Sequence, residues 1–315
     1  MLAPLVAAAP DDLELRLALG NALDLMGQIA LDMGDARASE RFLRDDLATL
    51  EAAPEGERQR PELRRSVSTA WGHLGDALDD RGDLAGALAS HRRSRTIRQA
   101  LASEFPDNAD YARIVSSARY YEALVLSEMG RWAEALPLFR ANVRDDPAGF
   151  SVLRMGDALE ALGRPAEALA QHRRVFRQHD AELQADSANL YKKLAVAEDR
   201  SKVCLMLARL REPAAAATCA QTEAFVAATP IEASNAFPRA IFARAWFRLG
   251  SAHELMATGH SSSASATHRL AARDMYRRSD EIWRDLGSRG LLSRNDAAQP
   301  DSVARALARV GGSAH

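Results

Sequence analysis

Lysine is scarce in this sequence, and its scarcity argues against several classes of enzyme. Among the 41 lysines and arginines of the 315-residue chain, only Lys192, Lys193 and Lys202 are lysine, and none of them follows a glycine. A P-loop needs a Gly-Lys pair, and a protein kinase needs a strand lysine together with H-R-D and D-F-G motifs. Neither set is present, so we predict no catalytic residue, no enzymatic activity and no cofactor.

Cysteine is also rare. Cys204 and Cys219 are too few to form a disulfide framework in a chain of this length. Cys204 stands where other parts of the chain carry a small buried glycine, and Cys219 lies in the segment expected to face it. A buried free cysteine behaves as a small hydrophobe. We therefore interpret both cysteines as reduced thiols.

Long apolar runs and a strong charge of either sign are absent as well. A membrane-spanning helix needs about 18 or more apolar residues, and the sequence has no such run. The apolar start, MLAPLVAAAP, has no basic flank and is a poor match to a signal peptide. The net charge of −2 argues against general affinity for nucleic acid. These features predict a cytoplasmic protein that binds neither membrane nor nucleic acid.

What the sequence does contain is helix-forming residues arranged in hairpins, best seen at residues 71–91. Trp71, Leu74 and Leu78 lie three and four residues apart and form one apolar stripe of a helix. Gly75 lets a second backbone approach that stripe closely. Gly82-Asp83 ends the first helix with a positive φ and caps the next one.

The glycines of such turns set a register for the chain. Gly34, Gly82, Gly130 and Gly163 are separated by 48, 48 and 33 residues, and another step of 48 leads to Arg211. The excess of 48 over 33 corresponds to about four helical turns. It fits either longer helices or longer loops, of which Pro54-Glu55-Gly56 is a candidate.

The hairpin at residues 71–91 resembles the tetratricopeptide (TPR) repeat, whose signature is W-x₂-L-G-x₂-Y…A-x₃-F…P. The long repeats resemble those of kinesin light chains. The resemblance implies an all-α, right-handed superhelical solenoid of about six TPR-like hairpins, closed by a C-terminal capping helix at about residues 303–310, with Asp301 or Ser302 as its N-cap. The expected solenoid covers residues 1–290, with 1–12 as the tail of a truncated repeat and 291–315 as the capping segment. The expected repeats span residues 13–60, 61–108, 109–148, 149–182, 183–232 and 233–290.

The C-terminal stretch from Tyr276 to Val310 resembles the closing segment that follows TPR repeats in bacterial serine/threonine protein kinases. It contains no catalytic motif. The resemblance implies that the chain is the regulatory part of a signalling kinase.

The histidines do not predict a metal site. His253-Glu254 begins like H-E-x-x-H, but the next histidine, His260, is seven residues on instead of four, so one helical face cannot present both. His91 and His172 fall where TPR repeats carry a bulky packing residue. The insert at residues 259–268, rich in serine and histidine, is expected to be a mobile loop.

In TPR superhelices the first helix of each repeat lines the concave groove, and we expect groove-facing residues beside the leucine–glycine stripe. The second helices carry arginines instead. Both sets fit ordinary solvated faces, or alternatively an acidic inner surface that attracts a basic or amphipathic segment. The predicted binding residues are Asp24, Gln28, Asp32, Asp76, Asp79, Asp80, Tyr120, Leu124, Phe150, Leu153, Asp157, Glu160 and Phe247.

The predicted function is non-enzymatic binding of a protein or peptide in this groove, as a scaffold or sensor. The alternative is a small-molecule-gated regulator with a pocket where short and long repeats meet. Some TPR proteins hold a C-terminal carboxylate with a Lys/Asn/Arg clamp, but the matching positions here are Asp24, Gln28, Gly72 and Asp76. Binding of a chaperone tail is therefore excluded. The identity of the partner and the oligomeric state do not follow from the sequence.

Overall fold

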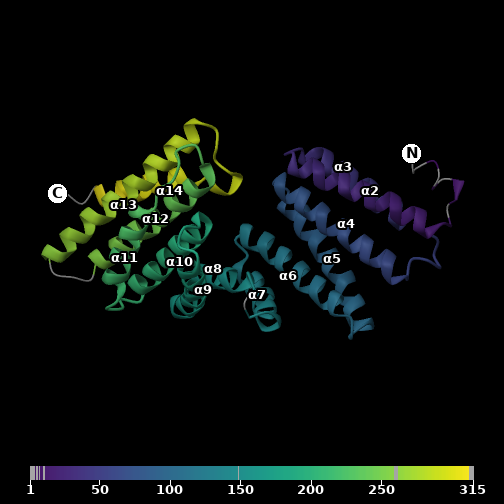
Figure 1. Cartoon of the computed structure of the whole chain (residues 1–315), viewed down its shortest axis with the longest axis horizontal. Coiled ribbons are helices and arrows are strands. Elements are labelled where there is room, and N and C mark those ends of the chain that lie inside the picture. Colours follow the sequence, from purple (N-terminus) through teal and green to yellow (C-terminus); the bar gives the residue numbers. More distant parts are fainter. Residues whose placement is uncertain are drawn as a thin grey trace. The chain divides into compact units, whose positions relative to one another are not determined.

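The computed structural model describes residues 11–147, 149–258 and 262–311, together with positions 4, 6, 8 and 9. Within them the chain forms 13 α-helices and no β-strand (Figure 1). In chain order the helices are α2 (Leu13–Asp32), α3 (Ala36–Glu51), α4 (Pro61–Asp80), α5 (Leu84–Glu104), α6 (Ala109–Glu128), α7 (Trp132–Asp145), α8 (Ser151–Ala161), α9 (Pro165–Ala185), α10 (Leu190–Arg209), α11 (Ala215–Ala228), α12 (Ala236–Ala257), α13 (Ser262–Ser288) and α14 (Gln299–Gly311).

The helices divide into two compact units, residues Met1–Ser151 and Val152–His315. In the first unit α2 packs on α3, α4 on α5 and α6 on α7, while α3 contacts α4 and α5 contacts α6. In the second unit α10 contacts α9, α11 and α12, and α13 packs between α12 and α14. Each helix therefore packs on helices that are near it in sequence. The all-α, TPR-like helical solenoid predicted from the sequence is confirmed.

The turns between paired helices follow the predicted register. Gly34, Gly82, Gly130 and Gly163 all have positive φ angles, between 68° and 80°. This left-handed conformation at a helix C-terminus favours glycine. Arg211 has a φ of 55°, and among the described residues it is the one residue other than glycine with a positive φ. The step of 48 residues from Gly163 to Arg211 thus identifies a real turn.

The length of the 48-residue repeats comes mainly from helix. Helices α4 and α5 contain 20 and 21 residues, whereas α8 contains 11. A smaller part is loop, because residues 52–60 separate α3 from α4. The repeat boundaries themselves stay predictions, and residues 1–3, 5, 7 and 10 of the expected truncated repeat lie outside the described residues.

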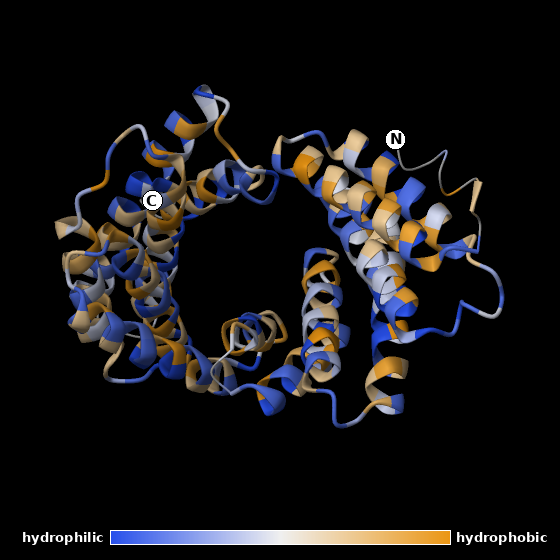
Figure 2. Cartoon of the chain, turned by 45° about the vertical axis from the view of Figure 1, so that its right-hand side comes forward, coloured by the Kyte–Doolittle hydropathy of each residue, from blue (hydrophilic) through white to orange (hydrophobic). Residues whose placement is uncertain are grey.

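Small residues on the first helices let bulky residues of the second helices pack closely. A Cβ atom at Gly75 would lie 2.6 Å from the ring of His91, and one at Gly156 would lie 2.6 Å from the ring of His172. Both histidines are buried, and burial lowers the pKa of His91 to about 4, so its ring is neutral at pH 7. The predicted packing role of these two histidines is confirmed. Figure 2 shows hydrophobic and hydrophilic residues alternating around the individual helices, as this packing requires.

The prediction of two reduced thiols is wrong. Cys204 on α10 and Cys219 on α11 form a disulfide, with a Cα–Cα distance of 5.2 Å. Both side chains are completely buried. The physical reason is the close approach of the two helices at the position that glycine occupies in other repeats, which puts the sulfur atoms in bonding contact. The sequence places the cysteines on facing helices, but it does not show how near the helices come.

The C-terminal helix closes the second unit. Val303 and Ala306 of α14 are fully buried in a core with Tyr276, Trp283 and Leu286 of α13. The capping helix is therefore present, but it begins at Gln299, so Asp301 and Ser302 lie in its first turn and are not its N-cap. Residues 262–268 of the serine- and histidine-rich insert belong to α13 and are helical, which corrects the expected loop there. Residues 259–261 lie outside the described residues.

Candidate functional site

The first unit brings the predicted binding residues Asp24 and Gln28 of α2 together and places Asp24 against α4. Asp24 of α2 accepts a hydrogen bond from Nε2 of Gln28, at 2.6 Å. The other carboxylate oxygen of Asp24 lies 2.6 Å from Nδ1 of His73 on α4. Both side chains of the Asp24–His73 pair are partly exposed. A carboxylate and a histidine from neighbouring repeats thus form a polar contact that a ligand can reach.

Asp76 extends this group along α4. Its carboxylate lies 3.6 Å from Nε2 of His91, which is neutral at pH 7. Burial raises the pKa of Asp76 to about 6; Asp79 adds to the increase, while His73 and Arg98 oppose it. Burial disfavours the charged form of His73, but the hydrogen bond and charge of Asp24 outweigh it, and the pKa of His73 is raised. Asp76 therefore loses its proton between about pH 5 and pH 7, later than an ordinary aspartate.

A further acidic residue, Asp46 of α3, is buried and interacts electrostatically with Asp24 and His73. Asp46 is only 2% exposed, and its Oδ1 has no hydrogen-bond partner among the described residues. Burial is the main reason that its pKa rises to about 8, and the charge of Asp24 raises it further, against a smaller opposing effect of His73. We call Asp24, Asp46, His73 and Asp76 the acidic cluster. Because Asp46 is mostly protonated at pH 7, it adds little negative charge to the cluster at that pH.

Because the pKa of Asp46 is raised in the folded state, its ionisation destabilises the fold. The folded chain holds this proton between pH 4 and pH 8, whereas the unfolded chain has lost it. The free energy of unfolding should therefore fall as pH rises through this window, by about 1.4 kcal/mol per pH unit at most. We expect Asp46→Asn to remove this slope and to be more stable than wild type at pH 7.5. Urea unfolding at several pH values measures it. The matched control is Asp45→Asn, at the exposed neighbouring position, and an equal effect of both variants would contradict the assignment.

The other predicted residues of the first unit differ in how far their side chains are exposed to solvent. Asp32 and Asp80 are exposed at the ends of α2 and α4. Tyr120 packs edge-on against Phe139, with ring centroids 6.3 Å apart. Asp79 and Leu124 are half-buried, and Phe150 is 86% exposed.

An aromatic residue that the sequence reasoning missed lies beside the acidic cluster. Tyr121 is 42% exposed and stacks on His91, with ring centroids 5.8 Å apart. It therefore presents an apolar ring next to Asp76 and its carboxylate neighbours. The sequence reasoning selected its neighbour Tyr120 instead.

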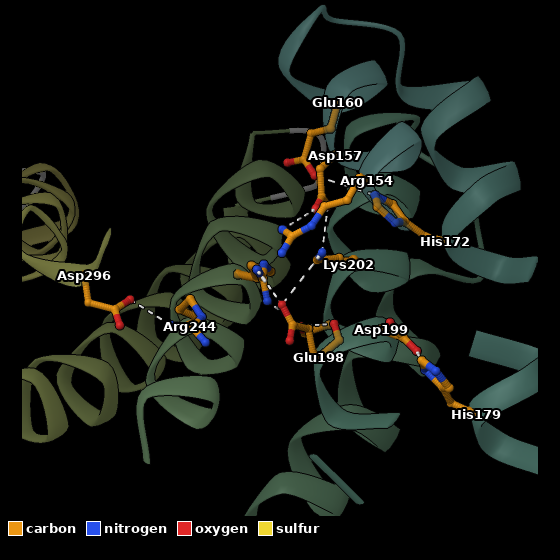
Figure 3. Close-up of polar contacts among 12 residues, drawn as sticks. Arg154, Asp157, Glu160, His172, His179, Glu198, Asp199, Lys202, Arg244 and Asp296 are labelled. Atoms are coloured by element: carbon orange, nitrogen blue, oxygen red, sulfur yellow. Dashed lines mark hydrogen bonds and ion pairs between the residues drawn. The ribbon is translucent and has the colours of Figure 1, made fainter. Parts of the chain in front are cut away.

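In the second unit the predicted acids are paired with cations of neighbouring helices (Figure 3). Asp157 of α8 accepts a hydrogen bond from Nζ of Lys202 on α10, at 2.6 Å. Glu160 lies 3.0 Å from Arg209 and 3.8 Å from His172. These contacts join α8 to α9 and α10 through polar side chains.

Glu198 is central to the same network. It lies 3.7 Å from Lys202 and 3.4 Å from Arg248 of α12. Burial acts to raise the pKa of Glu198, but the positive charges of Lys202 and Arg248, with smaller contributions from more distant arginines, lower it to about 2. Asp157, Glu160 and Glu198 are thus paired with lysine or arginine of the chain itself, whereas Asp46 and Asp76 of the acidic cluster have raised pKa values. The remaining predicted residues of this unit are half-buried, and Phe247 packs on Tyr276.

Several arginines of the second helices contact the next hairpin and do not simply form an outer basic surface. Arg92 and Arg95 of α5 both contact Glu122 of α6, a carboxylate that is only 2% exposed. Arg98 donates to the backbone oxygen of Ile114. These arginines therefore connect neighbouring hairpins.

Some of the residues that the sequence analysis did not select can be recognised from their spacing in the sequence. Asp46 interrupts the apolar positions Leu43, Leu47 and Leu50 of α3, so its spacing alone places it on a buried face. Glu198 and Lys202 have the i, i+4 spacing of a helical ion pair. The contact of His73 with Asp24 cannot be recognised from spacing, because the two residues are 49 positions apart.

Comparison with known proteins adds little to this description. No protein-family model matches the sequence, and no curated protein is significantly similar to it. Among solved structures, the chain is similar to a tetratricopeptide repeat protein from Parabacteroides merdae ATCC 43184, with a TM-score of 0.48 and 13% identity over 94% of this chain and 100% of that one. It is also similar to BtubC (BKLC) from P. vanneervenii, with a TM-score of 0.35 and 13% identity over 91% and 88% of the two chains.

The hairpins, the positive-φ turns and the glycine contacts decide the type of fold. The fold is TPR-like. None of the helices in the described part of this TPR-like chain is long and apolar enough to cross a membrane.

Proposed function

We propose that this TPR-like chain is a non-enzymatic scaffold that binds a basic or amphipathic protein segment at the acidic cluster of its first unit. The observation that carries the proposal is the partly exposed carboxylate of Asp76, which forms no ion pair with a lysine or arginine among the described residues. The pKa of Asp76 is raised to about 6, whereas pairing with cations lowers the pKa of Glu198 in the second unit to about 2. A lysine or arginine from a partner would supply the positive charge that the cluster lacks.

Apolar residues beside the cluster support an amphipathic partner. Leu25 and Ile29 on α2 and Met33 at its C-cap follow one another at intervals of four residues and are 57%, 50% and 81% exposed. Contiguous exposed apolar residues on a helix mark interaction surfaces. Tyr121 adds a half-exposed ring near Asp76. A helix with basic residues on one side and apolar residues on the other matches this combination.

Binding of a designed Lys/Leu helical peptide, with a Glu/Leu peptide of equal length as reference, tests the proposal by fluorescence anisotropy. We expect only the basic peptide to bind, more weakly at high salt and more tightly as pH rises from 5 to 7, because Asp76 then loses its proton. The double variant Asp24→Asn/Asp76→Asn should weaken binding about tenfold. Asp45→Asn/Asp107→Asn removes the same charge from exposed positions outside the cluster and should bind like wild type.

Equal binding of both peptides, or equal weakening by the two double variants, would show that the cluster does not select a basic partner. That the module regulates a bacterial signalling kinase, and that it resides in the cytoplasm, stay predictions that rest on the sequence.

A second candidate function, regulation by a small molecule, is supported by one cavity in the first unit. The cavity has a volume of ≈ 560 Å³ and lies between α3, α4 and α5. Its lining includes the aliphatic residues Leu63, Val67 and Ile97 together with Arg58. A thermal-shift screen of metabolites with apolar bodies and acidic groups would test it. A Leu63→Ala variant that kept every observed shift would exclude this cavity as the site.

A further inference from the structure

Two histidines from neighbouring helices of the second unit turn the same ring nitrogen towards each other. Nδ1 of His253 on α12 lies 3.0 Å from Nδ1 of His268 on α13. The ring centroids are 5.2 Å apart. His253 is 8% exposed and His268 is half-buried, so this pair can be reached from the side of His268.

A carboxylate on a third helix fixes the orientation of His253. Glu223 of α11 has its Oε1 2.5 Å from Nε2 of His253. A carboxylate accepts hydrogen bonds, so Nε2 carries the proton and Nδ1 of neutral His253 keeps its lone pair. That lone pair points at His268. Metal-binding histidines almost always donate their other ring N–H to a carboxylate or carbonyl in this way.

The distance between the two nitrogens is close to what a shared metal ion requires. Two imidazole nitrogens bound to one tetrahedral zinc ion lie about 3.3 Å apart, given zinc–nitrogen bonds of about 2.0–2.1 Å. A small rotation of the half-buried His268 side chain would open the observed 3.0 Å to this value.

We propose that His253 and His268 bind a divalent transition-metal ion such as Zn²⁺, Ni²⁺ or Cu²⁺, with Glu223 orienting His253. The described residues contain no group of three or more His, Cys, Asp and Glu side chains that could hold a metal ion. Solvent therefore completes the coordination on the open side. The spacing argument from the sequence considered only ligands on one helix, and here the second ligand comes from the next helix. The bound ion would tie α12 to α13.

The test uses the full chain without a histidine tag, freed of metal by chelation, and titrated with Ni²⁺ and Zn²⁺ by calorimetry. We expect one ion per chain and a thermal midpoint that rises with metal concentration. His268→Gln should abolish binding, and Glu223→Gln should weaken it about tenfold. His179→Gln removes a histidine that pairs with Asp199 elsewhere in the same unit and should bind like wild type.

Cu²⁺ electron paramagnetic resonance provides a second readout, because nitrogen hyperfine structure from two imidazoles should appear in wild type and be reduced in His268→Gln. His268 is half-buried, so this variant is expected to fold even if His253→Gln does not. Absence of metal binding by the wild type would overturn the proposal. So would retained binding in His268→Gln, or equal loss in His179→Gln.

Discussion

Replacement of Trp283 by alanine should lower the free energy of unfolding of the second unit by about 3–5 kcal/mol. Trp283 is fully buried on α13, in the core that joins α13 to α12 and α14. The substitution removes the largest side chain of this core and leaves a cavity that rigid helices cannot fill. Urea unfolding followed by far-UV circular dichroism measures the change.

The matched control lies on the same helix. Leu270 is 70% exposed, and Leu270→Ala should change stability by no more than about 0.5 kcal/mol. A loss of less than about 1 kcal/mol for Trp283→Ala, or equal losses for both variants, would show that α13 and α14 do not share a tightly packed core. If the Trp283→Ala substitution released only α14 from this core, the unfolding curve of that variant would show a separate transition at low urea concentration.

Reduction of the Cys204–Cys219 disulfide should destabilise the chain by about 3 kcal/mol. The cysteines are separated by 15 residues, and the bond joins α10 to α11. A cross-link restricts the unfolded chain, and a loop of this length corresponds to roughly that free energy in the chain-entropy description. The measurement is urea unfolding of the wild type with and without reductant.

A variant without the cross-link shows whether the reductant acts through it. Cys204→Ala/Cys219→Ala should unfold like the reduced wild type and should not respond to reductant. Titration of thiols in the denatured, unreduced wild type should find none. Two free thiols, together with identical unfolding curves in both conditions, would contradict the bond. Disulfides persist mainly in oxidising compartments, so the result also bears on the cytoplasmic location that the sequence predicts.

Much of the fold follows from the sequence because each hairpin is specified locally. A glycine three or four residues from a leucine predicts where two helices touch, as at Gly75 with His91. The glycine of each turn predicts where a helix ends. The same register located the turn at Arg211, which has no glycine at all. The start of a helix that no turn glycine precedes was predicted less accurately. Helix α14, for example, begins at Gln299 and not near residue 303.

The candidate sites were less predictable, because they depend on contacts between hairpins. The acidic positions Asp76 and Asp157 occupy the same place in their repeats, and the sequence treats them alike. The structure gives Asp157 a lysine partner and leaves Asp76 with a raised pKa. The difference arises because Lys202 of the neighbouring helix α10 contacts Asp157, whereas burial dominates at Asp76. A contact between two helices cannot be read from spacing along one of them. The disulfide escaped prediction for the same reason.

The burial of Lys202 has a practical consequence for chemical labelling. Lys202 is 3% exposed, and its amine is engaged by Asp157, so it should react slowly with amine-directed reagents. Lys192 and Lys193, the other two lysines of the sequence, are adjacent in the first turn of α10. An amine-reactive fluorophore at high pH would therefore attach its lysine-linked label almost entirely at this one turn, which provides a reporter without any engineered residue.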